Sequence, residues 1–170
     1  PLKLRAINAE YIRRLSPEEF LAKAEPWIDS AVHTPINKKL LCANLQPRCE
    51  VLEDIPPQLD FFDAVLPIDA EMYRNKKQKT TPESAKEALS ALLPVLEAQT
   101  DWSRDAIFEA CKQKAEAMEK KNGWLLFPLG IALSGKARTP GGGTDLAAMM
   151  GKEETLRRID HILATLKPAE

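Results

Sequence analysis

Apolar side chains recur along most of the chain at intervals of three or four residues, the spacing that places them on one face of an α-helix. The first stripe occupies residues 4–15, and a clear later stripe runs through Leu89, Leu92 and Leu96. No segment alternates apolar and polar residues for long enough to predict a strand. The pattern therefore predicts an all-α protein built from short helices joined by tight turns.

Several of the predicted helices carry capping signals. The segment Ser16-Pro17-Glu18-Glu19 is a capping box with proline at the first helical position. Thr81-Pro82 and Ser103 mark two further helix starts, and Thr34-Pro35 predicts another. Asn122-Gly123 predicts a helix end, because glycine tolerates the left-handed conformation found there. The remaining predicted elements are short helices at 47–57, 59–65 and 125–133, a flexible turn at 141–143 and a final helix at 156–166.

One polar, basic segment divides the chain. Residues 74–79 read RNKKQK and contain no apolar residue, which is typical of a linker, although such a run also suits contact with phosphates. We therefore expect two stacked helical subdomains, at residues 16–72 and 81–170, joined by a linker at 73–80. Residues 1–15 are expected to end a preceding region, and the absence of a Met at Pro1 predicts an excised fragment.

Composition narrows the class of protein. Apolar residues make up 44% of the 170 residues, which is enough for a packed core. No apolar run approaches the length of a membrane helix and no leader opens the chain, so we expect a cytoplasmic protein with no membrane partner. The net charge of −1 argues against a sequence-blind binder of DNA or other polyanions, but it leaves open a reader of RNA bases.

Residues that could carry chemistry are scattered. His33 and His161 have no Cys or His partner at ligand spacing, so no metal site is expected. The three cysteines fall in or beside apolar stripes, where cysteine acts as a small apolar residue, and no catalytic carboxylate pair is evident. Residues 130–137 nearly spell a phosphate-binding P-loop, but Ala137 replaces the required hydroxyl and no sheet surrounds the segment. We therefore expect no catalytic residue and no cofactor in this chain.

Four segments, in register along the chain, resemble the glutamyl-tRNA synthetases. Residues 128–135, PLGIALSG, resemble the PLRxALxG segment of that family, and residues 151–159, GKEETLRRI, are similar to its LLGKExxLRRL signature. Gln46-Pro47-Arg48 is similar to the family's RPR segment, and Asn8 to Arg13 resembles its N-x-x-Y-I-R stretch. The resemblance covers the whole chain, and together the four motifs are specific.

The resemblance implies the C-terminal half of a bacterial enzyme that ligates glutamate to its tRNA during translation. That half is the all-α anticodon-binding helix cage of a class I aminoacyl-tRNA synthetase, preceded by the last helix of the stem-contact region. The family uses ATP and Mg²⁺ in an N-terminal Rossmann-type domain, and we find neither of that domain's signature motifs here. We therefore expect a fragment that is inactive alone, monomeric, and a partner of tRNA-Glu.

The resemblance also assigns site residues. In the family, the arginine that matches Arg48 reads the third anticodon base, and the loop that matches Thr139 and Pro140 touches the first two. Arginine suits this task because its guanidinium carries only hydrogen-bond donors. The cytosine that ends glutamate anticodons offers two acceptors, whereas the guanine that ends glutamine anticodons offers two donors.

Other positions match less completely. Gly130 departs from the family, which commonly places an arginine there near the first two anticodon bases. Lys136 or Arg138 could supply the missing charge. Lys3 and Arg13 match basic positions that approach the tRNA stem in relatives.

Three alternatives stay open. One is a relaxed or duplicated synthetase that also accepts tRNA-Gln. Arg48 weighs against this alternative, and the absence of the family's arginine at Gly130 weakens that objection. A helical protein-interaction module without RNA binding would expose a large apolar patch. A P-loop nucleotide binder is the third.

Overall fold

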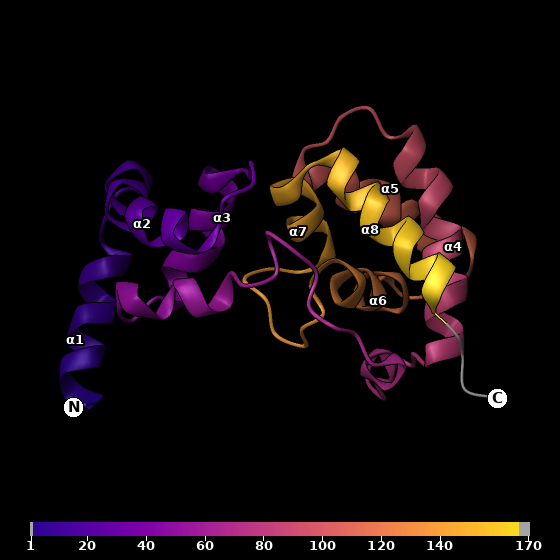
Figure 1. The fold of residues 1–170 in the computed structure, drawn as a ribbon, viewed down its shortest axis with the longest axis horizontal. Coiled ribbons are helices and arrows are strands. Elements are labelled where there is room, and N and C mark those ends of the chain that lie inside the picture. Colours follow the sequence, from indigo (N-terminus) through magenta and orange to yellow (C-terminus); the bar gives the residue numbers. More distant parts are fainter. Residues whose placement is uncertain (1, 167–170) are drawn as a thin grey trace. The chain divides into compact units, whose positions relative to one another are not determined.

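The computed structural model describes residues 2–166, and in this range the secondary structure is helical (Figure 1). A single bridge pairs Asn75 with Thr80, and no strand forms among the described residues. The all-α prediction is therefore confirmed. The α-helices and 3-10 helices (η) are, in chain order, α1 (Leu2–Arg13), α2 (Pro17–Ala31), α3 (Lys38–Leu45), η1 (Gln46–Arg48), η2 (Leu52–Asp54), η3 (Pro56–Gln58), η4 (Ala70–Tyr73), α4 (Pro82–Ala98), α5 (Arg104–Ala117), α6 (Asn122–Ser134), α7 (Gly143–Met150) and α8 (Lys152–Thr165).

The chain forms two compact units, Pro1–Ala64 and Val65–Glu170. The boundary expected at residues 73–80 differs from this division, because that segment belongs to the second unit. Tyr73 and Thr80 are buried there, and Thr80 Oγ1 donates a hydrogen bond of 2.7 Å to the Tyr73 carbonyl. Within residues 2–166, no helix is both long and apolar enough to cross a membrane.

The first unit begins with α1 and α2, which are joined by the predicted capping box. Ser16 Oγ accepts from the Glu19 amide at 3.1 Å, and the Glu19 carboxylate accepts from the Ser16 amide at 3.1 Å. Helix α2 packs against α3, and the 3-10 turns η2 and η3 close over α2. The core side chains of this unit include Phe20, Ala24, Ile28, Leu41, Leu45, Ile55, Leu59, Phe61 and Phe62.

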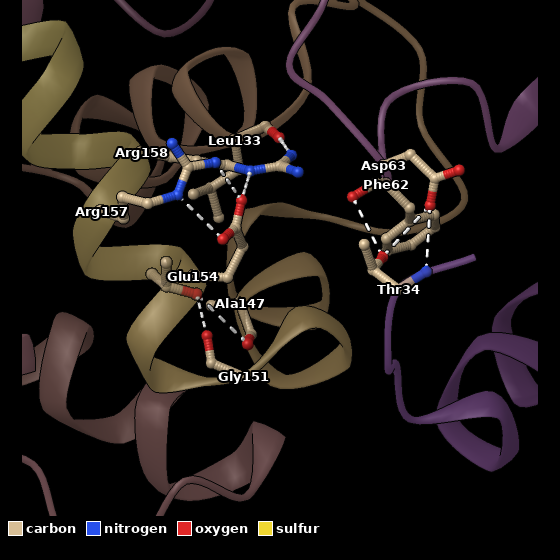
Figure 2. Close-up of polar contacts among 10 residues, drawn as sticks. Thr34, Phe62, Asp63, Leu133, Ala147, Gly151, Glu154, Arg157 and Arg158 are labelled. Atoms are coloured by element: carbon tan, nitrogen blue, oxygen red, sulfur yellow. Dashed lines mark hydrogen bonds and ion pairs between the residues drawn. The ribbon is translucent and has the colours of Figure 1, made fainter. Parts of the chain in front are cut away.

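The predicted helix start at Thr34-Pro35 is wrong. Helix α3 begins at Lys38 instead, and Asn37 Oδ1 caps it by accepting from the Leu40 amide at 3.0 Å. Thr34 is engaged elsewhere, since its amide donates to Asp63 at 3.1 Å and its hydroxyl lies within hydrogen-bond distance of the Phe62 carbonyl (Figure 2). Residues 46–58 form three 3-10 turns rather than one helix, and residues 59–65 form no helix.

In the second unit, α6 is the central helix and contacts α4, α5, α7 and α8. Most of its side chains are buried, as expected of a helix that is apolar on all sides. Thr81 and Ser103 cap α4 and α5 as predicted. The predicted helix end at Asn122-Gly123 is wrong: α5 ends at Ala117, where Glu119 adopts a left-handed φ of 57°, and Asn122 opens α6.

A buried arginine joins the last helix to the centre of this unit. Arg158 of α8 is 1% exposed; its Nη1 donates to the Leu133 carbonyl at 2.6 Å and its Nε to Glu154 at 2.8 Å (Figure 2). Arg157 also donates to Glu154, and the hydrogen bonds from the two arginines lower the pKa of Glu154 to about 2, although partial burial opposes the shift. Arg158 therefore links α8 to the C-terminal end of α6.

Candidate functional site

The guanidinium of Arg48 is exposed on the 3-10 turn η1 of the first unit. Gln46 fixes this turn, because its Nε2 donates to the carbonyls of Ile12 and Leu15 at 3.0 and 2.8 Å, at the end of α1. Cys49 is buried directly after it. Among residues 2–166, no hydrogen bond or ion pair engages the Arg48 side chain. A fixed backbone thus presents a guanidinium whose donors remain available to a ligand.

The two basic candidates on α1 differ in availability. Lys3 is exposed, and its ammonium has no ion-pair partner within residues 2–166. Arg13 Nη2 binds Glu10 at 2.7 Å, and Arg14 binds the same carboxylate at 3.2 Å. The hydrogen bond from Arg13 is the largest of the effects that lower the pKa of Glu10. Arg13 is therefore partly neutralised, whereas Lys3 is not.

In the second unit, the candidate residues gather on the loop of residues 135–142 at the C-terminal end of α6. Ser134 Oγ donates to the Gly130 carbonyl at 2.6 Å and accepts from the Lys136 amide at 3.0 Å, so it starts the loop. Gly135 adopts a φ of +74°, and a Cβ there would lie 2.5 Å from the Leu66 carbonyl oxygen. Only glycine fits this position without displacing the backbone of residue 66.

The far end of the loop returns to α6 beside Leu126, Leu129 and Gly130. Thr139 Oγ1 donates to the Gly141 carbonyl at 2.5 Å, and Asp145 accepts from the Gly142 amide at 2.9 Å. Arg104 of α5 holds Asp145 from the other side at 3.0 Å. A Cβ built on Gly130 would lie 3.8 Å from the Gly143 amide nitrogen, so the return passes directly beside Gly130.

The loop therefore carries Lys136, Arg138 and Thr139, and the residue that follows its return, Gly143, passes beside Gly130. Arg138 is exposed, whereas Lys136, Thr139 and Gly130 are half-buried. Pro140 is buried, so it shapes the loop from beneath rather than presenting a surface. Two residues that support the loop, Asp145 and Arg104, are not predicted by the sequence pattern. The pattern that could predict the role of Asp145 is its place three residues after Gly142, in the first turn of α7.

The cysteines of the described residues are not activated as nucleophiles. Cys42, Cys49 and Cys111 are buried and unpaired, and burial raises the pKa of their thiols to about 11, 11 and 12 respectively. Thiolates are therefore scarce at neutral pH. No group of three or more His, Cys, Asp and Glu residues among positions 2–166 could hold a metal ion. The P-loop-like residues 130–134 are the last turn of α6, whereas a P-loop connects a strand to the start of a helix.

Comparisons with known proteins agree on one family. The model of the anticodon binding domain family matches residues 19–163. The chain is 44% identical over 157 residues to the glutamate–tRNA ligase of Clostridium botulinum strain Hall, covering 92% of this chain and 32% of that protein. It is 41% identical to the glutamate–tRNA ligase of Clostridium acetobutylicum over 160 residues, covering 94% of this chain and 33% of that protein. It thus spans about a third of the length of these relatives.

Solved structures show the same fold. A glutamate tRNA ligase from Elizabethkingia meningosepticum, in complex with its amino acid, superposes with a TM-score of 0.75 at 24% identity, covering 96% of this chain and 32% of that one. A glutamate–tRNA synthetase from Elizabethkingia anophelis gives 0.72 at 22% identity, covering 95% of this chain and 31% of that one. With the family match over residues 19–163, these comparisons show that the chain belongs to the anticodon binding domain family.

Proposed function

We propose that this chain is the C-terminal, anticodon-reading portion of a cytoplasmic, monomeric glutamate–tRNA ligase, and that its partner is tRNA-Glu. The observation that carries the proposal is the exposed Arg48 guanidinium, which is held on a fixed turn and has no partner among residues 2–166. Ligation of glutamate with ATP and Mg²⁺ is assigned to the remaining two thirds of such a protein. The chain itself supplies recognition and no chemistry.

Arg48 suits discrimination at the third anticodon base. Its donors complement the O2 and N3 acceptors of cytosine and would face the N1 and N2 donors of guanine. The loop of residues 135–142 supplies the second contact, with Thr139 and Arg138 toward the first two bases. Lys3 and Arg13 are assigned to the stem, where phosphate contacts position the RNA without reading it.

A protein-binding role for α1 is a second candidate. Four large apolar side chains are exposed on this helix, Leu2 at 88%, Leu4 at 64%, Ile7 at 61% and Tyr11 at 56%. Such a stripe suits packing against protein. The two roles are compatible. The chain spans about a third of the length of its relatives, so α1 can pack against the rest of a ligase while other residues of the chain bind RNA.

The test is binding of this chain, at fixed salt, to tRNA-Glu and to the same tRNA with its third anticodon base changed from C to G. A preference for cytosine of about tenfold, equivalent to about 1.4 kcal/mol, supports an anticodon reader. Equal binding to both RNAs would instead indicate a relaxed enzyme that accepts tRNA-Gln. Absence of binding to either would favour the protein-interaction role.

Replacing Gly130 by arginine is expected to strengthen tRNA binding. A Cβ at this position meets the Gly143 amide nitrogen at 3.8 Å, an ordinary contact, so the first side-chain atom fits on α6 without displacing the backbone. The added guanidinium would supply a stacking plane and a charge where the chain after the loop passes α6. We expect a gain of about threefold to tenfold in affinity, equivalent to roughly 0.7–1.4 kcal/mol.

Gly130→Ala is the matched control for this substitution. Alanine removes the helix penalty of glycine, about 1 kcal/mol, without adding a charge. It should raise the melting temperature and leave tRNA affinity unchanged. If alanine and arginine improve binding equally, the gain comes from rigidity and the idea of a missing contact is wrong.

A further inference from the structure

The basic segment at residues 74–79 is a closed turn. The amide of Asn75 donates to the Thr80 carbonyl at 3.1 Å, and the amide of Thr80 donates to the Asn75 carbonyl at 3.0 Å. Inside the turn, Asn75 Oδ1 accepts from the Gln78 amide at 3.0 Å. Buried Thr80 and Tyr73 anchor its base. The turn therefore holds its side chains on an ordered backbone, which lowers the entropic cost of binding a ligand.

The lysines of this turn are uncompensated. Lys76, Lys77 and Lys79 are exposed, and no ion pair engages them within residues 2–166. The neighbouring cation Arg74 differs, because it binds Glu71 at 2.8 Å. Three positive charges thus project from one short turn into solvent, in a chain whose net charge is −1.

A second basic segment lies beside the turn. The Gln78 side chain rests directly on Gly123, since a Cβ at that glycine would lie 1.7 Å from Gln78 Oε1. Gly123 follows Lys120 and Lys121, which are both exposed. The residue directly before these two lysines is the acidic Glu119. We use the name basic patch for the lysines of the two segments, Lys76, Lys77, Lys79, Lys120 and Lys121.

We propose that the basic patch binds phosphates of the tRNA. This is the same tRNA whose anticodon contacts Arg48 and the loop of residues 135–142. This inference rests on the proposed function and adds a second, sequence-independent contact to it. Lysines are compact point charges that suit phosphates, and a nearly neutral chain needs such a concentration of charge to hold a polyanion. An acidic protein surface is the competing ligand, and the experiment below separates it.

The position of the patch fits one continuous RNA. Lys121 directly precedes α6, whereas the loop of residues 135–142 follows its other end. A helix of 13 residues is about 20 Å long. That span corresponds to about six nucleotides at roughly 3.4 Å each along one strand. An RNA whose anticodon touches the loop can therefore reach the basic patch with its adjoining stem.

The experiment compares the parent chain with the double variant K76Q/K77Q. Each is titrated with tRNA-Glu and with its third-base C-to-G form over a series of salt concentrations. Each lysine that meets a phosphate contributes about 0.7–0.9 to the slope of log affinity against log salt, so the slope should fall by about 1.5. At about 0.1 M salt this slope corresponds to about thirtyfold weaker binding of both RNAs, and we expect an unchanged preference for cytosine.

The control is K23Q/K39Q, which removes two exposed lysines of the first unit that have no ion pair within residues 2–166. This variant has the same net charge as K76Q/K77Q and should keep the parent slope. Equal losses in the two variants would show a general charge effect and overturn the inference. Circular dichroism should be identical for all three chains.

The outcomes also separate the inference from the proposed function. If the parent prefers cytosine but K76Q/K77Q binds like the parent, the patch does not touch RNA and the anticodon role stands. If the parent binds neither RNA, both proposals fail. If the parent then binds a polyglutamate probe and K76Q/K77Q does not, the ligand of the basic patch is an acidic protein.

Discussion

Replacing Arg48 by glutamine is expected to abolish the preference for cytosine over guanine while leaving the fold intact. Glutamine carries both donors and an acceptor, so it can bind either base, whereas guanidinium confronts guanine with donors only. An unsatisfied polar contact at this position costs roughly 1–3 kcal/mol, a factor of about 5 to 150 in affinity. Because Arg48 is exposed and engages no other residue of the described chain, its loss should change stability by less than about 0.5 kcal/mol.

The measurement is titration of both variants with tRNA-Glu and its C-to-G form, with thermal unfolding alongside. Arg48→Lys is the matched control: it keeps the charge and an all-donor head group but loses the planar fork. It should keep the sign of the preference at reduced size. If Arg48→Gln weakens binding to both RNAs by the same factor, Arg48 contributes charge and not discrimination.

Helix starts could be predicted wherever the capping interaction is local. Ser16 and Thr81 bind backbone amides three residues on, so the sequence contains both partners within one turn. Thr34-Pro35 carries the same signal, but Thr34 binds Phe62 and Asp63, about 30 positions away. That distant partner removes Thr34 from helix capping, and no local pattern reveals it.

The basic segment shows a similar limit. A polar run without apolar residues is typical of a linker, yet Asn75 and Thr80 pair across it and Thr80 is buried. Backbone pairing and the burial of a threonine leave little trace in composition. The division into units follows instead from packing, which separates the residues before Val65 from those after it.

For the candidate site, motif matching identifies the residues, but it does not show whether their side chains are exposed and unpaired. Arg48 and Arg13 are both arginines in matching motifs, and only the structure distinguishes the unpaired Arg48 from Arg13, which is bound to Glu10. The resemblance assigns Pro140 and Thr139 to the same contact loop, whereas the burial of Pro140 makes it a support for that loop. Exposure and ion pairing depend on the tertiary structure, so motif matching cannot supply them.

Arg158→Ala is expected to destabilise the second unit strongly, by about 3–5 kcal/mol. The substitution leaves a cavity in a site that is 1% exposed, deprives the Leu133 carbonyl of its donor, and removes this hydrogen bond between α8 and the end of α6. The neighbouring Arg157 binds the same Glu154, but its side chain is 62% exposed. Exposed pairs of this kind contribute about 1 kcal/mol or less, so Arg157→Ala should be nearly neutral.

Thermal unfolding followed by circular dichroism measures this difference. For a chain of this size, 1 kcal/mol shifts the melting temperature by about 2–4 °C, so we expect a decrease of about 10 °C for Arg158→Ala and a few degrees at most for Arg157→Ala. Both variants remove one arginine from Glu154, but Arg158 is buried and donates to the Leu133 carbonyl, whereas Arg157 is exposed. If the two melting temperatures fall equally, the stabilisation comes from the ion pairs with Glu154. In that case the hydrogen bond between Arg158 and Leu133 is not its cause.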